Sequence, residues 1–238
     1  MRTRGPGTPN REWLPSDSAL WETCRIVADS INGHALESQL ATYFPLSPGE
    51  VALVSGDATV DEFRAAGDGR YASQTTLVAG SGTFGLALGA ASLAATVIGN
   101  ANRRAQAQAD AQLRWRPGLQ GGIVVTTNAF YLQCAQGLFR WDWNSIDLMA
   151  VAQYNCAVFQ GRSASGPMTW RLSGPWTELV FALWALARHP QHPQFLDGSW
   201  LPANWIRWAT DQGFPPQLEP PALARGAVSG DDAGAGLR

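Results

Sequence analysis

The chain has 238 residues, of which 45% are apolar and 15% are charged, and its formal net charge is -2. This length and composition exclude a disulfide miniprotein, a collagen and a wholly disordered chain, and they allow one substantial core or two small ones. The slightly acidic balance supplies no overall field that would attract nucleic acid, so no nucleic-acid partner is expected.

Both ends of the chain are predicted to be disordered. Residues 1–15 are rich in Pro, Gly and Arg and lack the apolar run of a secretory signal, and residues 217–238 contain mainly small and polar side chains. Such segments bury too little apolar surface to offset the entropy of ordering them. The three cysteines form no CxxC or Cys/His ligand pattern, which favours a reducing, cytoplasmic location.

Residues 16–47 are predicted to form an N-terminal helical extension. Apolar side chains recur there at intervals of four, three and four residues, namely Leu20, Cys24, Val27 and Ile31. This spacing is typical of one helix face, and Asn32-Gly33 supplies a left-handed stop. A shorter helix is expected over residues 35–43.

From residue 48 the pattern changes to short strands. Residues 51–55 and 59–64 have β composition, and Gly56-Asp57 between them is a turn signal. Alternation of period two is clear in Phe139-Arg-Trp141-Asp-Trp143 and again in residues 168–173. Further strands are expected at residues 123–127, 129–134, 146–152 and 155–160. Strands at this spacing predict an antiparallel barrel or sandwich.

A helix is predicted to follow the last strand, from Pro175 to Arg188. Its apolar stripe comprises Trp176, Leu179, Val180, Leu183, Trp184 and Ala187. We expect this helix to cover an open edge or end of the sheet. Residues 189–216 then form a C-terminal extension with one more short helix over residues 202–212.

A long apolar segment interrupts the strands. No charged residue occurs between Arg70 and Arg103, and residues 77–98 would span about 30 Å as a helix, the thickness of a bilayer core. Small residues spaced by four permit close helix contact. The predicted membrane or helix–helix contacts are Phe84, Gly85, Leu86, Leu88, Gly89 and Leu93. The predicted contacts to anionic headgroups are Arg103, Arg104, Arg114 and Arg116.

Three other interpretations of these features stay open. The apolar run is equally well explained as a helix packed inside the protein or against a second copy. The run from Gly80 to Gly85 is a literal GxGxxG, which would suit a nucleotide, although no second strand with an acidic end follows. The six tryptophans of the last seventy residues fit either a core or a surface that binds a protein partner.

No catalytic, metal or cofactor site is expected. His189 and His192 flank prolines without a usable third ligand, and nothing resembles a GxSxG elbow. Asp61 and Glu62 would point to opposite faces of a strand, so solvated charge is the default for both. A non-enzymatic protein without a cofactor is therefore predicted.

The order of elements resembles bacterial PH-like and GRAM-like domains, in particular uncharacterised actinobacterial proteins that carry an apolar helical insert. The resemblance lies in Pro48-Gly49-Glu50 before the first strand, in Gly121-Gly122-Ile-Val-Val-Thr, in residues 99–105 through Trp115-Arg116, and in the terminal helix from Pro175. It implies an α+β fold over residues 48–188, with an insert at 77–113. About seven strands would form a bent antiparallel sheet, capped by the C-terminal helix.

The resemblance also implies a module that binds lipids or proteins. PH domains that grip inositol lipids do so with basic residues around the first hairpin, whereas this chain has Asp57, Asp61 and Glu62 there. Acids would repel phosphate. Any membrane contact is therefore expected at the apolar insert, and the partners expected are membrane lipid, further copies of the chain, or a protein.

Overall fold

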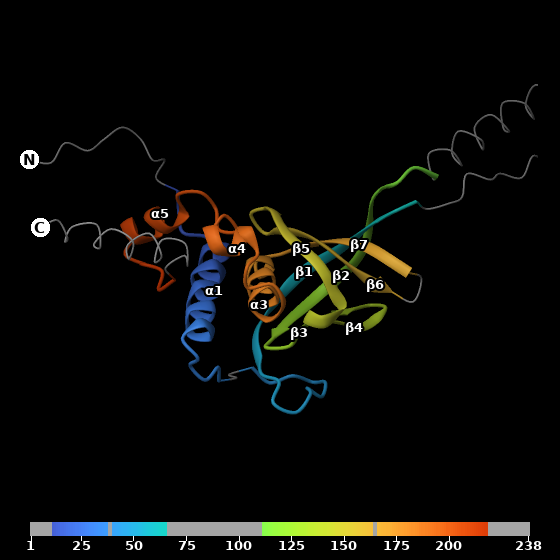
Figure 1. Cartoon of the computed structure of the whole chain (residues 1–238), viewed down its shortest axis with the longest axis horizontal. Coiled ribbons are helices and arrows are strands. Elements are labelled where there is room, and N and C mark those ends of the chain that lie inside the picture. The colour runs from blue at the N-terminus through green and yellow to red at the C-terminus, as the bar shows by residue number, and fades with distance from the viewer. Residues whose placement is uncertain (1–10, 38–39, 66–110, 164–165, 219–238) are drawn as a thin grey trace, which may run out of the picture. The chain divides into compact units, whose positions relative to one another are not determined.

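The computed structural model describes residues 11–37, 40–65, 111–163 and 166–218 (Figure 1). One compact unit comprises Met1–Asp61 with Gly118–Arg238, and a second comprises Glu62–Pro117. The predicted insert helix at 77–98 and the GxGxxG segment lie outside the described residues, as do most of the two predicted disordered ends.

Seven strands form one curled antiparallel sheet, and with the helices they make an α+β fold, as predicted. The order across the sheet is β4-β3-β2-β1-β7-β6-β5, so β4 and β5 are its two outermost strands. The strands are β1 (Ala52–Arg64), β2 (Arg114–Thr126), β3 (Ala129–Cys134), β4 (Gly137–Asp142), β5 (Ile146–Gln153), β6 (Cys156–Ser163) and β7 (Gly166–Ser173).

The period-two patterns fall on observed strands, β4 and β7, except that Trp143 lies just beyond β4 in a short 3-10 helix. In the pairing of β6 with β7, Phe159 lies opposite Trp170 and Ala157 opposite Leu172, and all four side chains are buried. Phe159 stacks on Trp170 with ring centroids 5.2 Å apart. Alternation predicted this face correctly because successive side chains of a strand point to opposite sides of the sheet.

The prediction of a turn at Gly56-Asp57 is wrong, because β1 runs without interruption through both residues. A Cβ atom at Gly56 would lie 2.8 Å from Nε1 of Trp176, which donates a hydrogen bond of 2.8 Å to the Ser55 carbonyl. Glycine is present here to admit an indole ring. Nor is Asp61 an uncompensated acid of a hairpin, since it pairs with Arg171 of β7 at 2.6 Å.

The N-terminal helix α1 (Pro15–Ile31) confirms the prediction, and Gly33 ends it with a positive φ of 70°. Leu20, Cys24 and Val27 are fully buried, whereas Ile31 is 45% exposed and does not join that face. The helix predicted at 35–43 is wrong for the described part of that segment, which has no helical turn. Phe44 packs there on Tyr131 of β3, with centroids 4.5 Å apart.

After β7 the chain forms α3 (Thr177–Arg188), α4 (Pro193–Asp197) and α5 (Trp205–Asp211), and a short 3-10 helix, η1 (Trp143–Ser145), joins β4 to β5. Helix α3 contacts β5, β6 and η1, and α1 contacts it too (Figure 1). It is therefore buried on nearly every side, including Glu178, and not only along the predicted stripe. Ala187, assigned to that stripe, is exposed.

The segment before α1 and helix α5 are joined around a buried acid. Asp17 is fully buried; it accepts a hydrogen bond of 2.9 Å from Nε1 of Trp205 and also pairs with Arg11. Trp13 stacks on Trp208 with centroids 5.3 Å apart. Burial of the aromatic rings on α5 thus depends on the N-terminal segment.

Within the described part of the chain, none of the helices combines the length and the apolar character needed to cross a bilayer.

Two adjacent glycines of β2 are expected to respond differently to alanine. A Cβ at Gly121 would lie 1.9 Å from the backbone oxygen of Gln133, whereas at Gly122 the nearest atom is 3.9 Å away. Gly121→Ala is therefore expected to destabilise the protein by about 3 kcal/mol, the upper part of the usual range for overpacking. Denaturant unfolding measures the effect, and Gly122→Ala is the matched control. Equal midpoints for the two variants would contradict the close approach of β2 to β3.

Candidate functional site

The predicted contact residues fall into two groups. Phe84, Gly85, Leu86, Leu88, Gly89, Leu93, Arg103 and Arg104 lie outside the described residues. Arg114 and Arg116 are described. They are the first and third residues of β2, directly after the expected end of the insert at residue 113. Being two residues apart on a strand, they share a side of it, and Trp115 takes the other.

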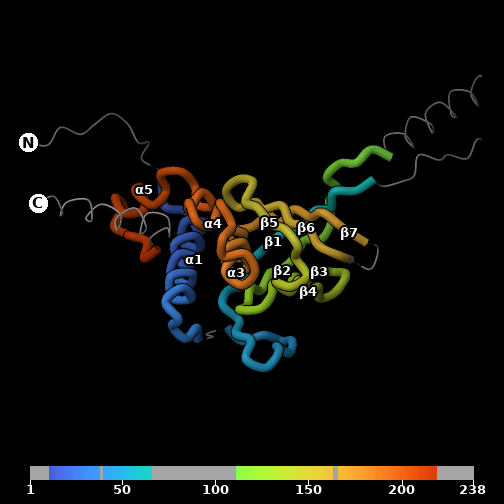
Figure 2. Tube along the Cα trace, in the orientation of Figure 1, coloured from blue at the N-terminus to red at the C-terminus, as the bar shows by residue number. Residues whose placement is uncertain are grey.

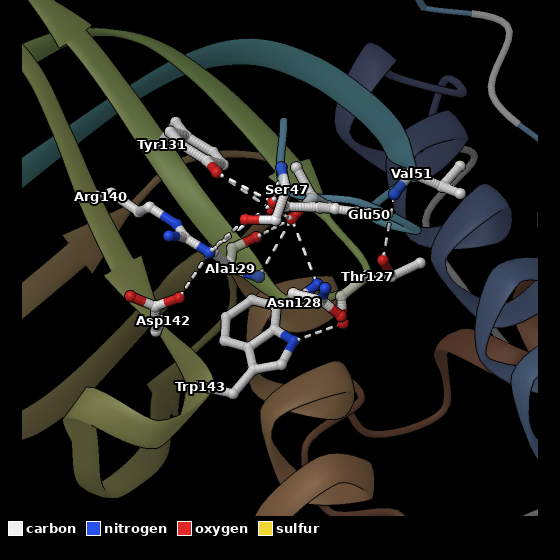
Figure 3. Close-up of polar contacts among 11 residues, drawn as sticks. Ser47, Glu50, Val51, Thr127, Asn128, Ala129, Tyr131, Arg140, Asp142 and Trp143 are labelled. Atoms are coloured by element: carbon white, nitrogen blue, oxygen red, sulfur yellow. Dashed lines mark hydrogen bonds and ion pairs between the residues drawn. The ribbon is translucent and has the colours of Figure 1, made fainter. Parts of the chain in front are cut away.

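A cluster that the sequence reading missed surrounds Glu50, just before β1 (Figure 3). The side chain of Glu50 has no exposed surface. Its carboxylate accepts hydrogen bonds from the Thr126 hydroxyl at 2.5 Å, from the Tyr131 hydroxyl at 3.1 Å and from the Ser47 backbone N–H at 3.0 Å. Thr126 and Tyr131 lie in β2 and β3, so Glu50 joins the preceding loop to two strands.

The ionised form of Glu50 is favoured by these donors. Burial by itself would raise the pKa of the carboxyl, but the hydrogen bonds from Thr126, Ser47 and Tyr131 outweigh it, and the pKa lies below its ordinary value. Burial and the charge of Glu50 both raise the pKa of Tyr131, so its hydroxyl keeps its proton and remains a donor.

Arg140 of β4 forms the outer rim of the Glu50 cluster. It pairs with Asp142 at 2.6 Å, approaches Glu50 at 3.7 Å, and lies over the Tyr131 ring at 5.5 Å from the centroid. Two carboxylates therefore face one guanidinium, which leaves no surplus positive charge for an anionic ligand. The cluster can hold the loop against the sheet, but its carboxylate is ionised, enclosed and already supplied with donors.

The sequence carried one weak signal for this cluster. Glu50 belongs to the Pro48-Gly49-Glu50 run that precedes a predicted strand. Its main hydrogen-bond partners lie 76 and 81 residues away in the sequence. Nothing in the local pattern distinguishes a buried glutamate from a solvated one, so only the tertiary structure identifies it.

A second buried acid, Glu178, lies in the first turn of α3. Its Oε1 accepts a hydrogen bond of 2.7 Å from the Asn155 backbone N–H, and its Oε2 has no hydrogen-bond partner among the described residues. Burial raises the pKa of this carboxyl to about 7. Glu178 interacts electrostatically with Tyr154 in the β5–β6 turn, and Tyr154 in turn lies near Asp17 and Arg11 at the start of α1.

The second unit brings aromatic and basic side chains together. The rings of Phe63 at the end of β1 and Trp115 at the start of β2 lie 5.2 Å apart, and Leu113 beside them is 67% exposed. Arg64 pairs with Glu62 at 2.5 Å. The described residues of this unit carry three arginines and one glutamate, a net charge of +2, in a chain whose total is -2.

Cysteine and histidine side chains can act as nucleophiles or metal ligands. Burial raises the pKa of Cys24 to about 12, which keeps it a protonated, unreactive thiol. His189 and His192 pack on the ring of Trp184, at centroid distances of 4.8 and 5.8 Å. Within the described ranges, no three His, Cys, Asp or Glu side chains are grouped so that they could hold a metal ion.

The fold defines the class of this protein, which is α+β with a curled seven-stranded antiparallel sheet. No family model matches the sequence, and no curated protein matches it significantly.

Proposed function

We propose that this chain is a non-enzymatic binding module of the PH-like or GRAM-like type, attached to a membrane through the segment between β1 and β2. The antiparallel sheet, its strand order and the helix that follows the last strand support the fold assignment. The two buried acids support the non-enzymatic part of the proposal, because Glu50 is already bonded to its neighbours and the Glu178 side chain has no access to solvent.

One observation carries the membrane proposal. The chain leaves β1 at Arg64 and re-enters the sheet at Arg114, and the segment between contains 32 consecutive uncharged residues, 71–102. Phe63 and Trp115 meet where that segment begins and ends. Aromatic rings and arginines beside an apolar segment suit the boundary between lipid tails and anionic headgroups.

Vesicle flotation tests the proposal with the full chain. The protein is expected to float with vesicles of phosphatidylcholine and phosphatidylglycerol, and Arg103→Gln/Arg104→Gln is expected to weaken partitioning about thirty-fold, since each basic residue near an anionic surface contributes about 1 kcal/mol. The matched control, Arg162→Gln/Arg207→Gln, removes the same charge from two exposed positions of the first unit.

The outcomes separate the alternatives for the insert. Wild-type protein that stays below the vesicles at low salt would refute membrane attachment. If that protein also has a multimeric mass by light scattering, and Gly85→Leu/Gly89→Leu lowers the mass, the insert serves self-assembly in place of lipid binding. A thermal shift with NAD(P) or ATP would instead support a nucleotide site at Gly80–Gly85.

A further inference from the structure

The outer edge of β5 is covered by side chains and not by another strand. β5 is the last strand in the order of the sheet, so among the described strands none pairs with the outer side of its backbone. Helices α3 and α4 lie next to it (Figure 2). An edge of this kind is a ready template for pairing with another chain unless it is blocked.

Gln194 of α4 forms the hydrogen bonds that a neighbouring strand would form, toward the C-terminal end of β5. Its Oε1 accepts a hydrogen bond of 3.0 Å from the Val151 N–H, and its Nε2 donates one of 2.9 Å to the Val151 carbonyl. A carboxamide carries one acceptor and one donor, like a peptide group, so a single side chain satisfies both outward backbone groups of one residue.

Two further side chains extend the cover along β5. Nε1 of Trp184 donates a hydrogen bond of 3.0 Å to the Ile146 carbonyl, and the His192 ring interacts with the backbone of Met149. Met149 and Val151 are two apart and so present their backbone groups to the same side. The sequence from α3 to α4 therefore follows β5 for most of its length.

The composition of β5 explains why its edge needs cover. β5 carries one charge, the exposed Asp147 near its start, whereas residues 148–152 are Leu-Met-Ala-Val-Ala, without a charge, and Leu148 is 52% exposed. The opposite outer strand, β4, carries Arg140 and Asp142, and charged side chains of that kind discourage pairing. An uncovered antiparallel edge of β5 is self-complementary, because two copies related by a two-fold axis present the same groups to each other.

We propose that Gln194 is an edge cap, which prevents β5 from pairing with β5 of a second copy of this chain. The cap belongs to the first unit and is independent of any membrane contact of the insert. Its removal leaves the N–H and the carbonyl of Val151 without their side-chain partner, so that this part of the edge can pair with β5 of a second copy.

Gln194→Ala tests the cap. The matched control is Gln191→Ala, at an exposed position three residues earlier and before α4. Hydrogen exchange of the Val151 amide is expected to rise at least tenfold in Gln194→Ala and to stay unchanged in Gln191→Ala. Sedimentation velocity is expected to show association of Gln194→Ala that increases with concentration.

A second substitution separates edge pairing from general loosening of the fold. Leu148→Lys adds a charge at an exposed position of β5 and, combined with Gln194→Ala, is expected to restore the mass of the wild type. The proposal is overturned if Gln194→Ala leaves the Val151 exchange unchanged, if exchange rises without a change of mass, or if the lysine fails to reverse the association.

Discussion

Glu178→Gln is expected to remove most of the decrease in the free energy of unfolding that ionisation of this carboxyl causes as pH rises. The folded pKa of Glu178 is about 7 against an ordinary value of 4.5, because the side chain is buried in the first turn of α3. The folded protein therefore binds the proton more tightly than the unfolded chain does. Stability from this group is complete below pH 4.5 and is lost as pH rises through 7.

The expected size follows from the same shift. Between pH 4 and pH 8 the free energy of unfolding of the wild type should fall by about 3 kcal/mol through Glu178, at 1.36 kcal/mol for each pKa unit. The glutamine keeps an oxygen to accept the Asn155 N–H but carries no charge at any pH, so it lacks this loss.

Urea unfolding at several pH values measures the difference between the two proteins. Subtracting the curves cancels the contributions of groups that do not interact with Glu178. Tyr154 does interact with it, but burial raises the pKa of that hydroxyl above its ordinary value of 10, so it keeps its proton over this pH range. Glu12→Gln, at an exposed position, is the control and should give a flat difference curve. A flat curve for Glu178→Gln as well would mean that Glu178 is solvated and titrates normally.

Glu50→Ala is expected to destabilise the protein by about 3 kcal/mol at neutral pH, because it leaves the buried Tyr131 hydroxyl and the Ser47 N–H without their acceptor. The Thr126 hydroxyl keeps the Ala129 carbonyl, at 3.0 Å, as an alternative acceptor. The pH dependence has the opposite sign to that of Glu178. The folded pKa of Glu50 lies below its ordinary value, so its contribution is present above pH 4.5 and declines as pH falls through the folded pKa.

A double-mutant cycle isolates the buried contact. Tyr131→Phe removes one donor, and Glu50→Ala should cost less in that background than in the wild type, since one group fewer is left unsatisfied. Glu62→Ala, whose carboxylate is partly exposed and pairs with Arg64, provides the control for loss of an acid. Additive effects of Glu50→Ala and Tyr131→Phe would show that the two side chains do not interact in solution.

The two acids also show where sequence reasoning reached its limit. The burial of Glu50 and of Glu178 could not be predicted from the sequence, because it depends on segments that meet only in the folded chain. Glu178 lies in α3, which packs against α1 from about 150 residues earlier in the sequence, and Glu50 is enclosed by β2 and β3. Asp61, read as a repelling acid, proved to be paired with Arg171 of β7.

The errors in the predicted elements have equally specific reasons. Gly56-Asp57 has the composition of a turn, but the glycine leaves space for Trp176, which arrives from 120 residues later. Residues 35–43 have enough apolar side chains for a short helix, yet Phe44 beyond them is drawn onto Tyr131 and the chain follows the sheet. Each competing contact is long-range, whereas propensity is local.

The sequence by itself determined the α+β class, most strand positions and the helices α1, α3 and α5, because strand and helix periods are read from neighbouring residues. Only the tertiary structure decided the strand order, the burial of Glu50 and Glu178, and the cover that Gln194 gives to β5. These features depend on pairs of groups tens of residues apart, whose meeting is set by chain topology and packing and leaves no periodic trace in the sequence.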